Sequence, residues 1–280
     1  MIAIFSALMS AETYDWMNYP MHSYIAGRGG AFLMERSIGN CLYNPSVTAL
    51  LKGSGASFSS GLLAFGRTYF HLNGCYRLQK NVSLLGGFTY GSIGGFTETN
   101  AFGDKLGDFS VQRMMFFGGF SYRFGRAPVT GGFLFKYFTE DNYTMQGYGY
   151  GLKLVLSAFL RSFSIGVFAD NIVQAVFWDD AEESYPFVFG LSAEKAIGKK
   201  LRLAAVVQSD PAFELNYRFG ADYAFTEKFS AGIGSNGLNI TAGVSFFIKD
   251  VKVHYSAQIE RGFSGFSNFV SFDLNIGGTR

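Results

Sequence analysis

The sequence predicts an all-β protein: a transmembrane, antiparallel, up-and-down β-barrel of about fourteen strands, preceded by a short N-terminal hatch that contains a small helix. Three observations predict this fold. Apolar and polar residues alternate along many strand-length segments, the composition is rich in aromatic residues and poor in charge, and the connections between segments alternate in length and charge.

The segment FELNYRFGADYAF, residues 213–225, shows the alternation most clearly. Successive side chains of a strand point to opposite faces, so the Phe, Leu and Tyr residues share one face, and Glu214, Arg218 and Asp222 share the other. In a soluble sheet the aromatic face would be the core. In a membrane barrel the aromatic face meets lipid and the charged face meets a wet lumen.

The composition favours the membrane. The 280-residue chain contains 32 Phe and 16 Tyr, but only 16% of its residues are charged, against about 25% in a typical soluble domain. No run of about 18 apolar residues is present to make a transmembrane helix. The net charge of +2 gives no reason to expect a nucleic-acid partner.

About fourteen strands can be placed after Gly53, with no convincing helix among them. An even number of antiparallel strands is usual for single-chain bacterial barrels. The predicted strands cover residues 56–65, 67–78, 81–93, 109–124, 127–139, 146–158, 162–173, 187–196, 200–208, 211–225, 228–235, 237–248, 251–260 and 267–276.

The connections between these strands supply an independent test. The set expected in the periplasm is short, and each member carries Lys or Arg: they lie near residues 79–81, 125–126, 160–161, 198–200, 226–228 and 249–250. The opposite set includes the long segments 94–108 and 174–186, the second strongly acidic, and two short members near 209–210 and 236–237. A soluble sandwich has no reason to sort its loops this way, so we expect a barrel surrounded by lipid in the bacterial outer membrane.

The extreme N-terminus and the two cysteines bear on export. Residues 1–11 contain a short apolar stretch that ends in small residues, so we expect them to be the remnant of an export signal peptide. The two cysteines leave the redox compartment open. We expect Cys41 and Cys75 to be unpaired buried residues, with a disulfide between them as the alternative.

Residues 12–53 are expected to form the hatch. Asn44 is a good N-cap, Pro45 suits the first helical position, and Gly53 can close a short helix. A ring of fourteen strands is too wide to be filled by its own side chains. The compact N-terminal segment is therefore expected inside the barrel, which residues 54–280 form.

The stretch AGRGGAFLMERSIGNCLYNPSVTAL resembles the N-terminal signature of the PorV/PorQ family of FadL-like outer-membrane proteins, with Asn44, Pro45 and Ser46 at the family's Asn-Pro-Ala position. The stretches GSIGGFTETNAFGDKLGDFSVQ and SIGVFADNIV are similar to that family's mid-barrel segments. The resemblance implies a channel for passive uptake of small hydrophobic or amphipathic molecules. Alternatively, it implies a component of a type IX secretion system, with secretion-system proteins as partners.

The charged strand faces supply the candidate lumen residues. We expect them to neutralise one another and to lock the hatch, in part through Glu35 and Arg36; the alternative is that some contact the head group of an amphipathic solute. An apolar pocket beside the hatch is expected near Phe32, Leu33 and Phe117. The lumen set comprises Arg113, Arg123, Lys153, Arg202, Glu214, Arg218, Asp222, Lys252, His254 and Glu260.

The remaining patterns point to no chemistry. Gly29 and Gly30 follow no strand and open no clear helix, so we expect a tight hatch turn rather than a phosphate loop. The histidines are scattered, and although His254 and Ser256 share a face, we expect no metal site, no cofactor and no catalysis. A solvated loop, rather than a calcium site, is expected for Asp179, Asp180, Glu182 and Glu183.

Overall fold

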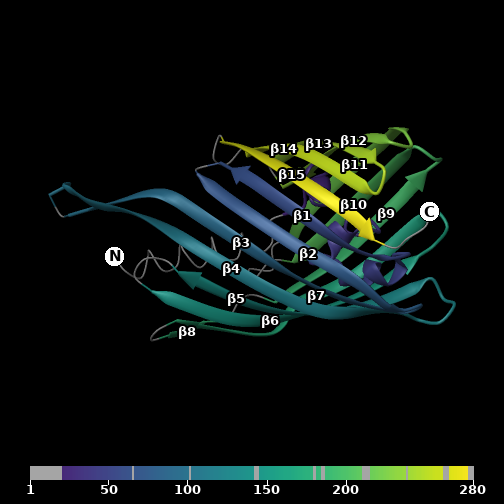
Figure 1. Ribbon diagram of the computed structural model, residues 1–280, viewed down its shortest axis with the longest axis horizontal. Coiled ribbons are helices and arrows are strands. Elements are labelled where there is room, and N and C mark those ends of the chain that lie inside the picture. The colour runs from purple at the N-terminus through teal and green to yellow at the C-terminus, as the bar shows by residue number, and fades with distance from the viewer. Residues whose placement is uncertain are drawn as a thin grey trace.

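The chain forms a closed antiparallel β-barrel in the computed structural model, with fourteen strands in the ring (Figure 1). Strands that follow one another along the chain pair side by side, and the pairing of β1 with β15 joins the first strand to the last. One further strand, β8, pairs with β7 alone. The structure describes residues 21–64, 66–100, 102–141, 145–178, 181–183, 187–209, 215–237, 239–260 and 265–276.

The observed strands match the fourteen predicted segments closely, because a period of two residues is a local property of the sequence. Their bounds are β1 Ser54–Leu63, β2 Arg67–Gln79, β3 Val82–Thr99, β4 Lys105–Arg123, β5 Val129–Asp141, β6 Gln146–Phe159, β7 Phe163–Trp178, β8 Ala181–Glu183, β9 Val188–Ile197, β10 Leu201–Ser209, β11 Leu215–Thr226, β12 Phe229–Asn236, β13 Asn239–Ile248, β14 Val251–Glu260 and β15 Gly265–Ile276.

The aromatic face of the strands lies on the outside of the barrel. In β11, Tyr217 and Phe219 are 45% and 55% exposed, whereas Arg218 and Asp222 are 6% and 2% exposed. The other strands repeat this arrangement, with aromatic and aliphatic side chains outward and serine, threonine and charged side chains inward. An apolar band around a closed barrel with a polar interior is the surface of a transmembrane barrel, so the inverted assignment is confirmed.

Two segments predicted as long loops are in part strands. Strand β3 runs on to Thr99 and β4 begins at Lys105, and this hairpin projects beyond the rest of the barrel in Figure 1. A bulge between Ile93 and Phe96 carries the ladder past Gly94 and Gly95, where the sequence pattern predicts the end of the strand. The Phe96 and Phe109 rings then stack with their centroids 5.1 Å apart. Similarly, β7 continues to Trp178 and turns back as β8.

The short turns fall where the loop pattern predicts them. Consecutive strands are joined at residues 80–81, 124–128, 160–162, 198–200, 227–228 and 249–250, all at one end of the barrel. The first strand starts at this same end, because Ser54 pairs with Ile276, near the C-terminus, and the Arg77 N–H donates to Ser54 Oγ. We refer to it as the turn end.

Residues 21–53, here called the luminal segment, lie inside the barrel. They include the helix α2 (Ser23–Ala26) and the 3₁₀ helices η1 (Ile38–Asn40) and η2 (Pro45–Leu50), and most of their side chains are buried against the inner faces of the strands. Within the described residues no helix is long and apolar enough to cross a membrane.

The predicted small helix is present, but its type and its end differ from the expectation. Asn44 caps η2, since its side chain accepts a hydrogen bond from the Ser46 N–H, and Pro45 occupies the first position. The helix is 3₁₀ and stops at Leu50, because Leu51 is already extended with φ −66° and ψ 141°. The prediction that Gly53 closes the helix is therefore wrong.

Candidate functional site in the barrel lumen

Arg28 holds the luminal segment to one side of the barrel. Its side chain is fully buried, and its Nε donates to Asp222 Oδ1 on β11 at 2.7 Å. Nη2 lies 3.3 Å from the hydroxyls of Ser230 and Ser245, on β12 and β13, and Nη1 donates to the Tyr24 carbonyl at 3.2 Å. A buried guanidinium is costly unless its donors are satisfied, so this network fixes the segment against three strands.

Gly29 and Gly30 form a tight turn after α2, as expected. Their φ angles are +68° and +71°, in the left-handed region that favours glycine. The Gly29 N–H donates to Thr241 Oγ1 at 2.8 Å, and a Cβ on Gly29 would lie 2.5 Å from the Phe219 carbonyl oxygen. The turn needs glycine both for its conformation and for its close approach to the wall.

The Asn-Pro-Ser motif fastens the other end of the segment. Asn44 Nδ2 donates to the Leu33 carbonyl at 2.9 Å, and Ser46 Oγ donates to Ser157 Oγ on β6 at 2.7 Å. A Cβ on Gly132 of β5 would lie 2.4 Å from the Ser46 nitrogen, so the backbone of the motif lies directly against the wall. In this structure the motif is a packing and hydrogen-bonding element.

Every predicted lumen charge that the structure describes lies on the inner face; Glu214 lies outside the described residues. Most of them have charged partners, which favours the structural role. Arg123 is half-buried at the turn end, Arg218 is buried, and Lys252 lies over the Phe247 ring, 4.6 Å from its centroid. The ion pairs are Arg113–Glu140 at 3.1 Å, Lys153–Asp170 at 3.1 Å, Arg202–Asp222 at 2.8 Å, Glu260–Arg67 at 2.7 Å and His254–Asp273 at 3.6 Å.

Glu35 joins the luminal segment to Arg202, as predicted. Burial alone would raise the pKa of Glu35, but the Arg202 guanidinium, helped by Lys252, lowers it to about 2. Arg36 forms no ion pair among the described residues; its guanidinium lies over the Phe159 ring, 4.9 Å from the centroid. Only one member of the expected pair therefore locks the segment through charge.

A cavity of about 30 Å³ lies between the luminal segment and the inner faces of β4–β7 and β9–β11. Leu33, Leu42, Met115, Phe168 and Val188 form its apolar lining. Lys136, Lys153, Asp170, Gln208 and Arg218 form its polar end. A cavity that binds benzene measures about 150 Å³, so a ring-sized solute needs more room than the cavity has in this conformation.

The wall beside this cavity carries a large bulge in β7. The β6–β7 register steps from Lys153↔Asp170 to Gly151↔Gln174, so β7 contains two extra residues there. Asn171 has φ +54°, and Ile172 and Val173 are 40% and 51% exposed on the outside. Within the described residues, β7 pairs with β9 only as far as Asp170↔Val188. The ladder of the wall is therefore irregular where the polar end of the cavity meets it.

Lys136 links the cavity to the bulge. Its Nζ lies 2.5 Å from Asp170 Oδ1 and 2.9 Å from Asn171 Oδ1, and the Asn171 N–H donates to Asp170 Oδ1 at 2.8 Å. Sequence reasoning did not single out Lys136, Asp170 or Asn171. The inward face of β5 would have indicated Lys136, but the bulge interrupts the alternation directly after Asp170, so Asn171 is buried where an outward residue is expected.

The predicted pocket residues divide between this cavity and the packed interior. Leu33 lines the cavity. Phe32 is fully buried against the Tyr24 ring, with the centroids 5.9 Å apart, and Phe117 stacks on His71 at 5.8 Å. Neither phenylalanine belongs to the cavity lining.

The cysteines, Ser256 and the acidic residues near β8 are the other residues that the sequence pattern singles out. Cys41 and Cys75 are free and buried. Ser256 Oγ has no hydrogen-bond partner in the described part of the chain, so it forms no nucleophile–base pair with His254. Asp179 and Asp180 lie outside the described residues, and Glu182 and Glu183 are described only as part of the backbone of β8.

Comparison with known proteins identifies the architecture. No family model and no curated protein matches the chain. The Pseudomonas putida toluene transporter TodX superposes with a TM-score of 0.68 and 13% identity, covering 90% of this chain and 97% of that one. The Ralstonia pickettii toluene transporter TbuX gives a TM-score of 0.61 and 12% identity, covering 91% and 98%. The fold is that of these toluene transporters.

At sequence identities this low, the similarity shows a shared fold and nothing more. A second TodX structure, described as a monoaromatic hydrocarbon channel with a double deletion, gives a TM-score of 0.62 and 12% identity over 91% of this chain and 99% of that one. The chain therefore shares nearly the whole barrel of TodX rather than a part of it. The narrower resemblance to the PorV/PorQ family is not confirmed by these matches.

Proposed function

We propose that the protein is an outer-membrane channel for the passive uptake of small hydrophobic or amphipathic molecules. The observation that carries the proposal is the cavity between the luminal segment and the wall, which adjoins the β7 bulge. The TodX and TbuX fold supports it, since those structures are described as toluene transporters. The apolar outer face supports a location in the outer membrane, where such barrels occur.

The exit route leads sideways through the wall. Passage along the barrel axis toward the turn end is closed by hydrogen bonds between the luminal segment and the strands. Thr48 Oγ1 lies 2.6 Å from Ser121 Oγ, and Ser83 Oγ donates to the Thr48 carbonyl at 3.1 Å. The bulge at Ile172 and Val173, in contrast, interrupts the ladder. A hydrophobic solute that leaves there enters the bilayer directly and avoids the aqueous periplasm.

The polar end of the cavity suits the head group of an amphipathic solute. Lys136 and Lys153 share the single carboxylate of Asp170, and Arg218 lines the same space. A solute carboxylate or hydroxyl can accept hydrogen bonds from these cations while its apolar part contacts Leu33 and the neighbouring aliphatic lining.

Uptake by whole cells tests the proposal. Production of the chain in a bacterium without hydrocarbon channels should raise the uptake rate of radiolabelled toluene above the vector background. Leu33→Trp fills the cavity and should return the rate to background, whereas Leu203→Trp, on the outer face, should leave it high. Undiminished uptake through a correctly folded Leu33→Trp barrel would rule out this cavity as the route.

The alternative role in type IX secretion is supported by no comparison and by no contact among the described residues, and we do not propose it.

A further inference from the structure

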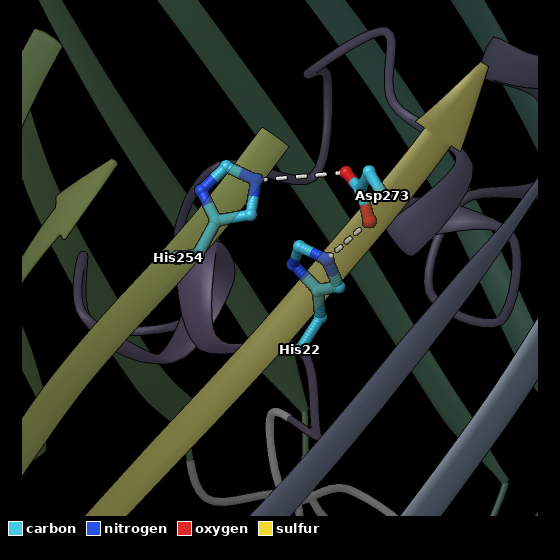
Figure 2. A group of neighbouring side chains, drawn as sticks. All are labelled: His22, His254 and Asp273. Atoms are coloured by element: carbon cyan, nitrogen blue, oxygen red, sulfur yellow. Dashed lines mark hydrogen bonds and ion pairs between the residues drawn. The ribbon is translucent and has the colours of Figure 1, made fainter. Parts of the chain in front are cut away.

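Two histidines and an aspartate meet where the luminal segment contacts the last two strands of the barrel (Figure 2). His22 immediately precedes α2, His254 lies on β14, and Asp273 lies on β15. His22 Nε2 is 2.9 Å from Asp273 Oδ1, and His254 Nε2 is 3.6 Å from Asp273 Oδ2. Figure 2 shows both rings turning a nitrogen toward the same carboxylate.

The cluster is almost inaccessible to bulk solvent, and at least one of its polar atoms forms no hydrogen bond among the described residues. The side chains of His22, His254 and Asp273 are 0%, 3% and 3% exposed. His254 Nε2 has no hydrogen-bond partner within the described residues, although it is aimed at the cluster. A buried polar atom of this kind calls for an explanation, and an unseen ion is one of the standard ones.

We propose that His22, His254 and Asp273 bind one divalent transition-metal ion, of which Zn²⁺ fits best. Two imidazole nitrogens and a carboxylate oxygen are ligands that Zn²⁺ prefers. The three ligand atoms already lie within 4.8 Å of one another. Bond lengths of about 2.0–2.2 Å put tetrahedral ligand atoms about 3.4 Å apart, so the His22 ring would move slightly away from Asp273 Oδ1, now 2.9 Å from it, to admit the ion. A water molecule completes the tetrahedron.

Neighbouring hydroxyl groups hold two of the ligands in place. Ser245 Oγ lies 2.7 Å from His254 Nδ1, and Ser37 Oγ donates to Asp273 Oδ2 at 3.3 Å. Partners of this kind orient ligating rings and carboxylates in metal sites. An entry path is present as well, because His254, Ser37 and Ser245 border a cavity of about 210 Å³ that also reaches Lys199 and Lys200 at the turn end.

The ion would clamp the luminal segment to the wall. It links His22 to residues more than 200 positions away in the sequence, so binding would oppose any displacement of α2 from β14 and β15. This inference does not depend on the proposed transport function, since a structural ion can hold the segment whatever the barrel carries. Loss of transport in the Leu33→Trp test and loss of metal in the test below are therefore separate results.

The test uses the full-length chain, purified in detergent and stripped with a chelator. Titration calorimetry with Zn²⁺ should show one saturable site per chain. Co²⁺ should give visible d–d bands without the thiolate charge-transfer band that ligation by Cys41 or Cys75 would produce. These measurements on the unchanged protein need no variant to fold, and absence of saturable binding would overturn the proposal.

Variants locate the ion. His254→Gln and Asp273→Asn should each weaken Zn²⁺ binding at least tenfold. His71→Gln should leave it unchanged, because His71 is an equally buried lumen histidine that contacts Thr89 and Asn73 instead. Zn²⁺ should raise the unfolding temperature of the wild-type and His71→Gln proteins only. Equal affinity in all three variants would place the ion elsewhere and refute the assignment.

Discussion

The luminal segment packs closely against one part of the barrel wall and leaves a cavity beside another. At β12 the backbone of the segment touches the wall directly: a Cβ on Gly234 would lie 2.2 Å from the Arg28 carbonyl carbon. Where the same segment faces β4–β7 and β9–β11, it leaves a cavity that ends at the β7 bulge. The backbone of the segment is therefore fixed closely at β12, whereas side chains such as Leu33 border open space in the cavity. In the proposed route, a path opens at the cavity without release of the whole segment.

Loss of the anchor should have the largest effect on stability. Arg28→Met removes the contacts of the buried guanidinium with Asp222, Ser230, Ser245 and the Tyr24 carbonyl together, so the loss should reach about 3–5 kcal/mol, as for a broken buried ion pair. Urea unfolding in detergent, followed by circular dichroism, measures the change. Lys105→Met is the control: Lys105 and its partner Asp108 are 60% and 61% exposed, so the loss of this surface ion pair should change stability little. Equal costs would show that Arg28 is not a special anchor.

The strands on both sides of the lumen turn their apolar faces outward, toward lipid. Tyr217→Arg should lower the free energy of unfolding by about 2–4 kcal/mol if the ring lies near the middle of the bilayer. Asn216→Ser, one residue earlier and on the inner face, should cost little. Unfolding of the two variants in lipid vesicles measures both values, and equal tolerance would contradict the outward aromatic face.

The tight contact beside β12 can be tested by one methyl group. Gly234→Ala should destabilise the barrel by about 1–3 kcal/mol, because the new Cβ meets backbone atoms that cannot swing away. Gly118→Ala provides the control, since the nearest atom to its Cβ is 3.9 Å away. Thermal unfolding of the two variants should differ clearly; matching curves would mean that the segment can shift at no cost.

A substitution in the cavity lining should change the solute selectivity of the channel more than the stability of the barrel. In Lys153→Met, Asp170 keeps Lys136 as a partner, so stability should change little. Uptake of an anionic amphiphile should fall about tenfold, equivalent to about 1.4 kcal/mol, while uptake of toluene stays the same. Lys252→Met, outside this cavity, should change neither rate. An equal loss for both solutes would assign Lys153 a purely structural role.

Alternation along each strand predicts the barrel well, because it reports the two faces without knowledge of the partner strand. It places Arg218 and Asp222 inside and Tyr217 outside before any pairing is known. The same local rule fails at Gly94–Gly95, where a bulge looks like the end of a strand, and at Asn171, where a second bulge turns a single residue inward.

The partners of the lumen charges depend on register and on the fold of the luminal segment. Asp273 stands on the inward face of its strand by alternation, but nothing local brings His22 to it across the chain. Arg28 sits in the glycine-rich motif and was not singled out, since its role appears only when Asp222 lies beside it. The cavity likewise arises from the luminal segment and seven different strands, and it has no linear signature.

Deletion of Ile172 and Val173 tests most directly whether solutes cross the wall at the β7 bulge. Removal of two residues makes the β6–β7 register continuous and preserves the inward and outward alternation. Deletion of Gly94 removes the bulge in the β3–β4 hairpin and serves as the control. The expected result is toluene uptake at background in the first variant and at the wild-type rate in the second. Wild-type uptake through a folded barrel that lacks residues 172 and 173 would contradict the lateral route.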